Sequence, residues 1–339
     1  MKEAALLQHL KDNPFVLAPM AGITDKPFRT FMRKQGCGVV VTELVSATGL
    51  KYSSQKTRQL MEFDSSQHPV GIQIFGDELE HLRDAAKEVE QMGADFVDIN
   101  FGCPVPKVVS KGAGSACLKD LKKLGEVIRA TKSGVGIPVT IKIRTGWDHE
   151  TRNSSEVVRI AKEEGVTWVA IHGRTRAAGY TGRADWDYIK EVKAGSALPI
   201  IGNGDIVSAK MAIERIQQSH CDAVMIGRGC LKNPLIFREA LELLKASGAT
   251  VTKDMYQLLS DLVVHLDDFY EDRMTMLQVK KFASWYSAGY PSSAQFRRQL
   301  FQLKERSEVM SAIEEFCGGI QELTQEDTSQ EPFLMGGHG

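Results

Sequence analysis

The sequence lacks paired cysteine motifs. Its six cysteines are scattered through 339 residues, with no CxxC pair and no histidine at metal-ligand spacing beside them. Structural zinc sites and iron–sulfur clusters need such spacing, so we expect no metal in this protein. Unpaired cysteines in a long chain are typical of reduced thiols, and we expect a cytoplasmic protein.

Long apolar runs and an excess of charge are missing too. No apolar run approaches the roughly 18 residues that a membrane span needs, so we expect no membrane partner. Forty-two basic and 43 acidic side chains leave a net charge of −1. A nucleic-acid partner would therefore have to be held by a local basic patch. With 42% hydrophobic and 25% charged residues, the composition is that of a soluble globular protein of roughly two domains.

Eight short β-rich runs are present, most of them separated by stretches of helical period. They are Val16 to Met20, Val39 to Leu44, Val70 to Phe75, Phe96 to Phe101, Val139 to Arg144, Trp168 to His172, Ile200 to Asn203 and Ala223 to Gly227. Alternating strands and helices with near-continuous apolar strands are typical of a parallel sheet covered on both faces. Eight units favour an α/β fold with a closed (β/α)₈ TIM barrel over an open doubly wound sheet, whose early GxGxxG turn is absent.

The sequence predicts four segments along the chain, and only the first of them has strand signals. We predict a barrel domain over 1–245, a linker over 246–254, an all-helical domain over 255–323 and a flexible tail over 324–339. The helical domain follows from long helical periodicity without a further strand signal.

The residues at the ends of the strand-like runs, where a barrel of this type builds its active site, are unusually polar as a group. They are Pro19, Met20, Ala21, Glu43, Gln73, Asn100, Cys103, Lys142, Arg144, His172, Asn203, Gly204, Asp205, Gly227 and Arg228. A barrel with a purely structural role would need few of them.

Lys142 alternates with Ile141 and Ile143, so its side chain faces the opposite side of the strand. Two interpretations stay open. An acidic neighbour holds the lysine in a structural ion pair, or the lysine points a cation at an electron-rich ligand in the barrel mouth.

The turns GNGD (202–205) and GRG (227–229) follow the last two runs. Backbone N–H groups at this place in the fold often bind phosphate. Either turn alone is common after a strand, but together they indicate a phosphorylated cofactor.

His172 opens a loop that also holds Arg174 and Tyr180. It is either a hydrogen-bonded structural residue or part of a surface for an anionic ligand.

Cys103 lies just past the fourth run, in the sequence NFGCP (100–104). A lone cysteine is usually inert packing. The tight loop that its glycine and proline neighbours predict favours a chemical role, either as a nucleophile or as a proton donor.

The helical segment carries a cluster of positive charge that we call the basic island. Seven basic residues against one acidic residue fall between 273 and 306, namely Arg273, Lys280, Lys281, Arg297, Arg298, Lys304 and Arg306. Aromatic residues interleave with them, namely Phe282, Trp285, Tyr286, Tyr290, Phe296 and Phe301. The mixture suits phosphate contacts and base stacking, although a solvated helix face over a core is the ordinary alternative.

Several long motifs resemble the tRNA-dihydrouridine synthases and, within them, the bacterial DusB-like branch. They are APMAGITDKPFR (18–29), the strand with Gln73, DINFGCPVPKVV (98–109), GAGSACL (112–118), TIKIRTGW (140–147), HGRTRAAGYTGRADWDYI (172–189), IGNGDI (201–206) and GRGCLKNP (227–234). Such a series of ordered matches is highly specific.

The resemblance implies a flavin enzyme in which NADPH reduces FMN, hydride passes to C6 of a tRNA uridine and Cys103 protonates C5, giving 5,6-dihydrouridine. It places Pro19, Met20 and Ala21 near the flavin ring and Gln73 and Lys142 at the ring edge. His172, Asn203, Gly204, Asp205, Gly227 and Arg228 would lie toward the ribityl chain and phosphate. For the substrate it suggests Asn100 at the uracil edge and Lys107, Arg174, Arg297 and Arg298 on RNA phosphates. We expect a monomer.

Two alternatives stay open. One is a flavin oxidoreductase acting on a free pyrimidine or enone, and the other is a barrel protein that binds RNA without catalysis. Removal of residues 250–339 is expected to spare flavin binding and to weaken RNA binding if the linker is drawn correctly.

Overall fold

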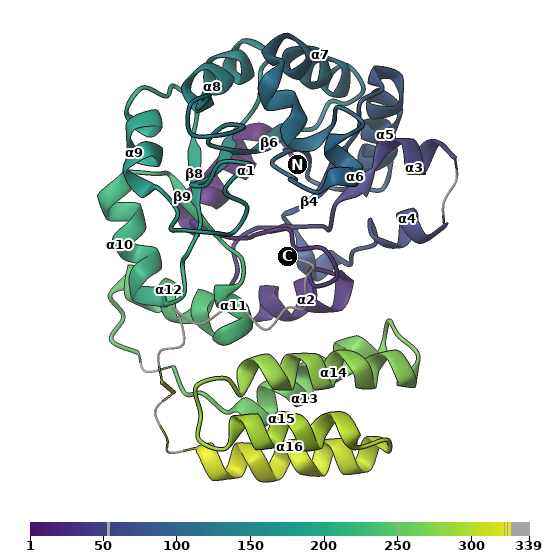
Figure 1. The fold of residues 1–339 in the computed structure, drawn as a ribbon, viewed down its shortest axis with the longest axis vertical. Helices are drawn as coiled ribbons and strands as arrows, with labels where there is room; N and C mark the ends of the chain where they lie inside the picture. The colour runs from purple at the N-terminus through teal and green to yellow at the C-terminus, as the bar shows by residue number, and fades with distance from the viewer. Residues whose placement is uncertain (53–54, 250, 322, 324, 327–339) are drawn as a thin grey trace.

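A barrel of parallel strands forms the centre of the molecule (Figure 1). The computed structural model describes residues 1–52, 55–249, 251–321, 323 and 325–326. The strands are β1 (Phe15–Leu17), β2 (Val40–Val41), β3 (Val45–Ser46), β4 (Val70–Phe75), β5 (Phe96–Phe101), β6 (Val139–Arg144), β7 (Val169–His172), β8 (Ile200–Asn203) and β9 (Ala223–Ile226). Their order around the sheet is β1-β9-β8-β7-β6-β5-β4-β2.

The two ends of this sheet meet. Leu17 N donates to Val39 O at 2.9 Å, and Gly38 N donates to Phe15 O at 2.8 Å, so β1 is joined to the segment that leads into β2. The (β/α)₈ barrel predicted from the sequence is therefore confirmed.

The second predicted run is split in two. Both β2 and β3 pair with β4 in parallel, through Val40 beside Val70 and Val45 beside Ile74. Between them the chain leaves the ladder, and Glu43 there accepts a hydrogen bond from the backbone of Gly22.

The inside of the barrel changes from apolar to polar along the strands. At the N-terminal end, Leu6 and Leu10 of α1 (Glu3–Asp12) pack with Phe96 and Trp168, whose rings meet edge to face at 5.0 Å. Because side chains alternate along a strand, residues 98 and 100 point to the same side as Phe96, nearer the mouth. The alternation thus places polar side chains at the C-terminal end.

Helices surround the barrel between the strands (Figure 1). They are α2 (Lys26–Lys34), α3 (Ala47–Lys51), α4 (Gln55–Gln59), α5 (Leu79–Gln91), α6 (Pro106–Val109), α7 (Leu121–Lys132), α8 (Ser154–Glu163), α9 (Trp186–Ala194), α10 (Ala209–Ser219), α11 (Gly229–Lys232) and α12 (Ile236–Lys245), with 3₁₀ turns at Ser65–Gln67 and Gly114–Lys119. Asp120, Asp185 and Ser208 begin α7, α9 and α10, each by accepting a backbone N–H in the first turn.

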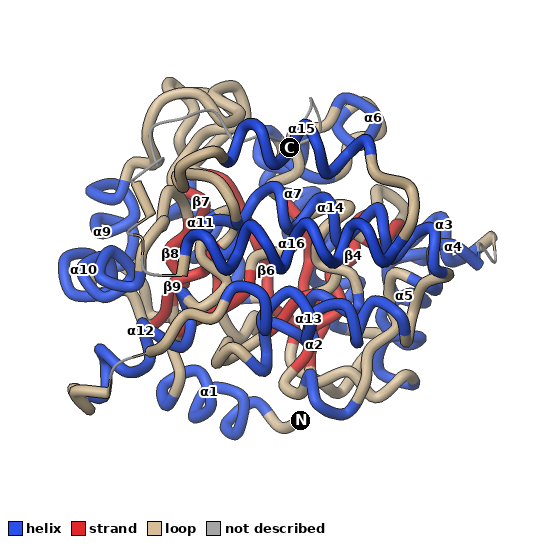
Figure 2. Tube along the Cα trace, turned by 90° about the horizontal axis from the view of Figure 1, so that it is seen from below, coloured by secondary structure: helices blue, strands red, loops and turns tan. Residues whose placement is uncertain are grey.

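Four further helices form a layer beside the barrel, namely α13 (Met255–Asp267), α14 (Asp272–Tyr286), α15 (Ser293–Gln302) and α16 (Arg306–Ile320) (Figure 1). Seen from below, α13, α14 and α16 cross in front of the strands (Figure 2). α13 packs against α2, and the rings of Phe28 and Phe282 stack at 5.0 Å between α2 and α14.

The helices of this layer fall within the predicted segment 255–323, while the division of the chain into domains stays a prediction. Of the predicted tail, only residues 325 and 326 belong to the described part, and the rest lies outside it. None of the helices within the described residues combines the length and apolarity needed to cross a membrane.

Candidate active site

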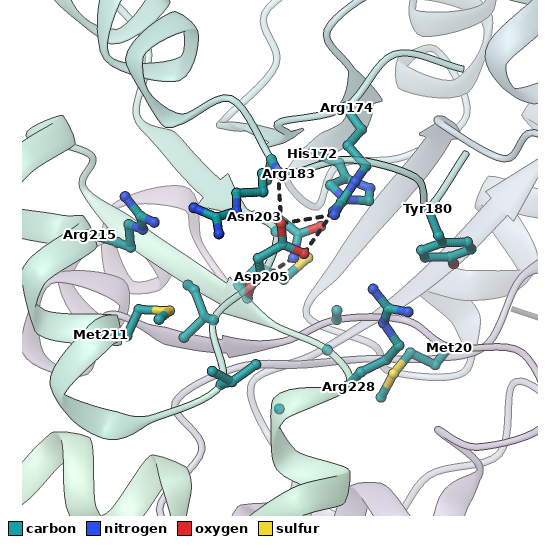
Figure 3. A pocket seen from close by; sticks show the side chains of 18 of the residues that line it. Met20, His172, Arg174, Tyr180, Arg183, Asn203, Asp205, Met211, Arg215 and Arg228 are labelled. Atoms are coloured by element: carbon teal, nitrogen blue, oxygen red, sulfur yellow. Dashed lines mark hydrogen bonds and ion pairs between the residues drawn. The ribbon is translucent and has the colours of Figure 1, made fainter. Parts of the chain in front are cut away.

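A cavity of about 530 Å³ opens at the C-terminal ends of β1, β6, β7, β8 and β9 (Figure 3). The predicted site residues that line it are Pro19, Met20, Lys142, His172, Arg174, Asn203, Gly204, Asp205, Gly227 and Arg228. In Figure 3, Met211 and Arg215 lie at one side of the cavity, and Met20, Tyr180 and Arg228 lie at the other. The strand ends thus bring together most of the residues predicted to hold a cofactor.

Lys142 of β6 lines this cavity without a hydrogen-bond or ion-pair partner among the described residues. The nearby carboxylate of Asp98 is already used, because Gln73 Nε2 and Thr140 Oγ1 each donate to it at 2.6 Å. Burial and, second, the cation of Arg144 lower the pKa of Lys142 to about 8, although Asp98 acts in the opposite direction. Lys142 is therefore a cation without a structural ion pair, available to a ligand.

The turn after β8 is held by an ion pair. Asp205 accepts two hydrogen bonds from the guanidinium of Arg174, at 2.8 and 2.9 Å, and a third from Ala184 N at 2.7 Å. Arg174 is only 5% exposed. Both residues therefore shape the cavity wall, and their charges are largely occupied by each other.

Gly204 in this turn leaves no room for a side chain. Its φ is +128°, and an added Cβ would lie 2.5 Å from the Cβ of Ala184. The side chain of Asn203 donates to Met225 O at 2.7 Å and so joins the ends of β8 and β9. The close approach explains why glycine is needed here.

His172 is a neutral ring within this wall. Burial lowers its pKa well below the ordinary value, and the cations of Lys142, Arg144, Arg174 and Arg228 lower it further. A neutral imidazole donates one hydrogen bond and accepts another.

The turns after β8 and β9 can receive an anion. The backbone N–H groups of Gly204, Gly227 and Gly229 have no hydrogen-bond acceptor in the part of the chain that the structure describes. Arg228 and Lys232 line the same cavity. Unpaired amides beside cations form the kind of surface that binds a phosphate.

Cys103 lies just past β5, at the end of a chain of side-chain amides. Gln73 accepts from Asn100 Nδ2 at 2.8 Å, and Asn100 Oδ1 in turn accepts from Cys103 N at 2.7 Å. Gln73, Asn100 and Cys103 are not among the residues that line the cavity. They form instead a support between Asp98 and the loop that carries the thiol.

The thiol of Cys103 is held protonated. Burial raises its pKa above the ordinary value, and the N–H of Val105 and the cations of Arg144 and Lys142 offset only part of that effect. A protonated, half-buried thiol can give up a proton to a strong base, but it is a poor nucleophile at neutral pH.

The roles that the family resemblance implied did not include Arg144 or Tyr180, although the structure places both beside the site. Arg144 donates to Gly102 O at 2.9 Å and to the carbonyls of Thr175 and Gly179 at 2.8 Å, so it ties the Cys103 loop to the loop after β7. Tyr180 lines the cavity, with the guanidinium of Arg228 4.6 Å from its ring centre. Arg144 lies on the same face of β6 as Lys142, because side chains alternate along a strand, and this alternation was the signal that could have identified it. Met211 and Arg215 of α10 also line the cavity, and nothing in their helical context marked them.

A family model described as dihydrouridine synthase matches residues 16–323. The chain belongs to the dihydrouridine synthase family. It is 38% identical over 307 residues to "tRNA-dihydrouridine synthase B" of Pseudomonas aeruginosa, covering 90% of this chain and 92% of that one. It is 37% identical over 317 residues to "Probable tRNA-dihydrouridine synthase" of Rickettsia prowazekii, covering 91% of this chain and 96% of that one. The resemblance found in the sequence is confirmed.

Solved structures of other proteins share the fold of this dihydrouridine synthase family member. Histamine dehydrogenase from Rhizobium sp. 4-9 aligns with a TM-score of 0.51 at 13% identity, over 75% of this chain and 49% of that one. A 2-naphthoyl-CoA reductase aligns with a TM-score of 0.53 at 13% identity, over 69% of this chain and 50% of that one. This chain thus matches about half the length of each, and at this identity the likeness shows the barrel fold alone.

Several residues that the family resemblance implicated lie away from the cavity. Ala21 is exposed just after Met20, and Lys107 is exposed on α6. On α15, Arg297 is half-buried and Arg298 is exposed. These positions stay predictions for contacts outside the cavity.

Part of the basic island is used within the protein. Arg306 pairs with Asp267 and Asp272, and Lys280 Nζ donates to Leu303 O at 2.5 Å. Five of the six interleaved aromatic side chains are buried, namely Phe282, Trp285, Tyr286, Tyr290 and Phe296. The ordinary alternative of a helical core is therefore correct for them, and only Phe301, 55% exposed, remains free to stack on a base.

No group of three or more metal-ligating side chains occurs within the described residues.

Proposed function

We propose that this protein reduces specific uridines of tRNA to 5,6-dihydrouridine, with FMN in the cavity at the barrel mouth and NADPH as reductant. The observation that carries the proposal is the amine of Lys142, which lines that cavity without a carboxylate partner in the described part of a dihydrouridine synthase family chain. The names of the relatives from Pseudomonas and Rickettsia support tRNA as the substrate.

The residues present fit FMN. A volume of about 530 Å³ is in the ordinary range for a small-molecule site. The free amides of Gly204 and Gly227, with Arg228 beside them, suit the phosphate. Met20 and Lys142 would hold the ring end, where the lysine cation favours a ring that gains negative charge.

Bound FMN supplies the hydride that C6 of the uracil receives. Cys103 supplies the proton that C5 receives, so that one hydride and one proton together saturate the C5–C6 bond. The raised pKa of Cys103 keeps the thiol protonated until the uracil becomes basic enough to take its proton. Asn100 and Arg144 hold the loop on which this thiol stands.

The uridine must leave its stack to reach the site, which favours loops of folded RNA over a duplex. Lys107 and Arg298 are exposed and would bind the phosphates of the RNA around it, with the half-buried Arg297 beside Arg298. Exposed cations of this kind add affinity that depends strongly on salt.

The test is reoxidation of the reduced flavoprotein. Protein loaded with FMN and reduced by NADPH should be reoxidised faster by unmodified tRNA than by free uridine, and dihydrouridine should appear in the tRNA by mass spectrometry. Equal rates with tRNA and uridine would favour an enzyme for free pyrimidines. A protein that takes up no FMN but binds tRNA would favour the RNA-binding alternative.

A further inference from the structure

The backbone of Gly22, in the loop after β1, is held from both sides. Its N–H donates to Glu43 Oε2 at 2.5 Å, and its carbonyl accepts from Lys281 Nζ at 2.8 Å. Glu43 lies in the break between β2 and β3, whereas Lys281 lies on α14 and is 259 residues away from Gly22 in the chain. The barrel and the C-terminal helices therefore fix one residue together.

Both bonds involve a charged side chain, and the bond to Glu43 is the more shielded from water of the two. Glu43 is 8% exposed. Lys281 is half-buried, with its amine 5.5 Å and 5.2 Å from the ring centres of Phe282 and Trp285. Hydrogen bonds to charged groups are stronger than bonds between neutral groups. The exposed Gly22 has a φ of +71°, a conformation that glycine adopts without strain but that it leaves readily, so the two bonds are what fixes it.

The same helical layer holds the far end of this loop. The hydroxyl of Tyr270, which follows α13, donates to Asp25 Oδ2 at 2.8 Å. Asp25 also begins α2 by accepting from Phe28 N at 3.0 Å. Loop residues 20–25 are thus attached to the C-terminal helices at two points.

The loop carries Met20, which lines the cavity. Thr24 Oγ1 accepts from Met20 N at 2.9 Å and donates to Met20 O at 3.1 Å, which closes the loop into a compact ring. A shift at Gly22 is therefore passed on to Met20, because the ring leaves little freedom between them.

We propose that Lys281 is a positioning residue for the cofactor cavity: with Glu43 it fixes Gly22, and through the loop it fixes Met20. The proposal rests on the proposed function only in naming FMN as the ligand. Lys281 belongs to the basic island, but in this proposal it supports the cavity and does not bind RNA. The proposal also reverses the expectation that removal of residues 250–339 spares flavin binding, because that removal takes Lys281 and Tyr270 away.

The experiment compares Lys281→Met, Lys281→Arg and Lys304→Met in the full chain. Lys304 is the matched control, since it is an exposed lysine of the same island with no bond to the described residues. Three quantities are measured: hydrogen exchange of the amides of residues 20–25 without cofactor, the dissociation constant for FMN, and the salt dependence of tRNA binding.

Lys281→Met should speed exchange at Gly22 by about tenfold and weaken FMN binding by about three- to tenfold. Lys281→Arg should bring the exchange rate at Gly22 and the affinity for FMN much closer to the wild-type values. Lys304→Met should change neither the exchange rate nor FMN binding. The logarithmic salt slope for tRNA should stay at the wild-type value in Lys281→Met and fall by about one in Lys304→Met. Wild-type exchange in Lys281→Met, or a lowered salt slope with unchanged FMN binding, would overturn the proposal.

If Lys281→Met fails to fold, Glu43→Ala tests the same restraint from the barrel side. It should speed exchange at Gly22 and weaken FMN binding, and wild-type values for both would equally overturn the proposal. If the wild-type chain binds no FMN, the proposed function fails, while the exchange rates still decide the role of Lys281.

Discussion

The side-chain oxygen of Asn100 accepts the backbone N–H of Cys103 at 2.7 Å. The same oxygen accepts from Gly102 N at 3.1 Å, while the amide nitrogen of Asn100 donates to Gln73 at 2.8 Å. The family resemblance suggested Asn100 for the uracil edge, and the side-chain oxygen of this residue is already used by the loop. Asn100 acts on the thiol through the backbone that carries it.

Asn100→Ala should lower the rate of dihydrouridine formation by about 10- to 100-fold, because the thiol would lose its fixed position. The dissociation constant for FMN should stay unchanged, since Asn100 does not line the cavity. A single turnover of reduced enzyme with unmodified tRNA measures the rate. Val105→Ala, an exposed side chain of the same loop, is the control and should react at the wild-type rate. A wild-type rate in Asn100→Ala would contradict the role given to this bond.

Cys103→Ala should keep FMN and tRNA binding but lose at least about 100-fold in dihydrouridine formation, which is the ordinary contribution of a general acid. Because burial raises the pKa of the thiol, the wild-type rate should not increase between pH 6 and pH 8. Full activity in the variant would remove Cys103 from the reaction. A rate that climbs tenfold per pH unit would instead indicate a thiolate nucleophile.

The strands with the clearest apolar runs could be predicted from the sequence to the residue. β4, β5 and β6 have the predicted bounds because both faces of each strand are buried, which leaves a continuous signal with sharp ends. The second strand could not be predicted in the same way. At its break Glu43 contacts the backbone of Gly22, and the sequence carries no signal for a contact between these separate segments.

Site residues on the strands could be predicted, because side chains alternate along a strand and the C-terminal ends of the strands build the site. Lys142 and His172 are examples. Residues on helices gave no such signal. Trp285 and Tyr286 have the spacing of a stacking surface and also of a core, and only the packing of α14 shows that they are buried. Lys281 looked like a phosphate contact because its acceptor, Gly22, lies in a distant loop.

Lys142→Met should stabilise the cofactor-free protein at pH 7 by about 1–3 kcal/mol, because an unpaired charge leaves the barrel. The pKa of Lys142 falls from 10.5 to about 8 on folding, so below pH 8 the folded state bears the full cost of the charge. Between pH 8 and 10.5 the folded state releases the proton first, and the advantage of the variant should shrink. Denaturant unfolding at pH 7, 9 and 10.5 measures this change. A destabilised variant at pH 7 would show that the amine has a structural partner.

Gly204→Ala should destabilise the protein by about 2–4 kcal/mol, because the new Cβ would lie 2.5 Å from Ala184 and 3.1 Å from the ring of His172. Gly179→Ala is the matched control. Gly179 also has a positive φ, +57°, but nothing lies within 4 Å of its added Cβ. It should cost only about 1 kcal/mol. Equal losses in the two variants would mean that backbone strain, and not the crowded cavity wall, dominates at Gly204.

An island cation without a partner in the described chain can be distinguished from a paired one, Arg306, by the salt dependence of tRNA binding. Arg298 is exposed on α15 without a partner in the described chain, so Arg298→Ala should weaken tRNA binding and lower the logarithmic salt slope by about one. Arg306 already pairs with Asp267 and Asp272, and Arg306→Gln should change the slope much less while lowering stability by up to about 1 kcal/mol. Binding titrations at several salt concentrations compare the two variants. If Arg306→Gln lowers the slope as much as Arg298→Ala does, the acidic residues of α13 and α14 give up their arginine when RNA binds, and the island acts as one surface.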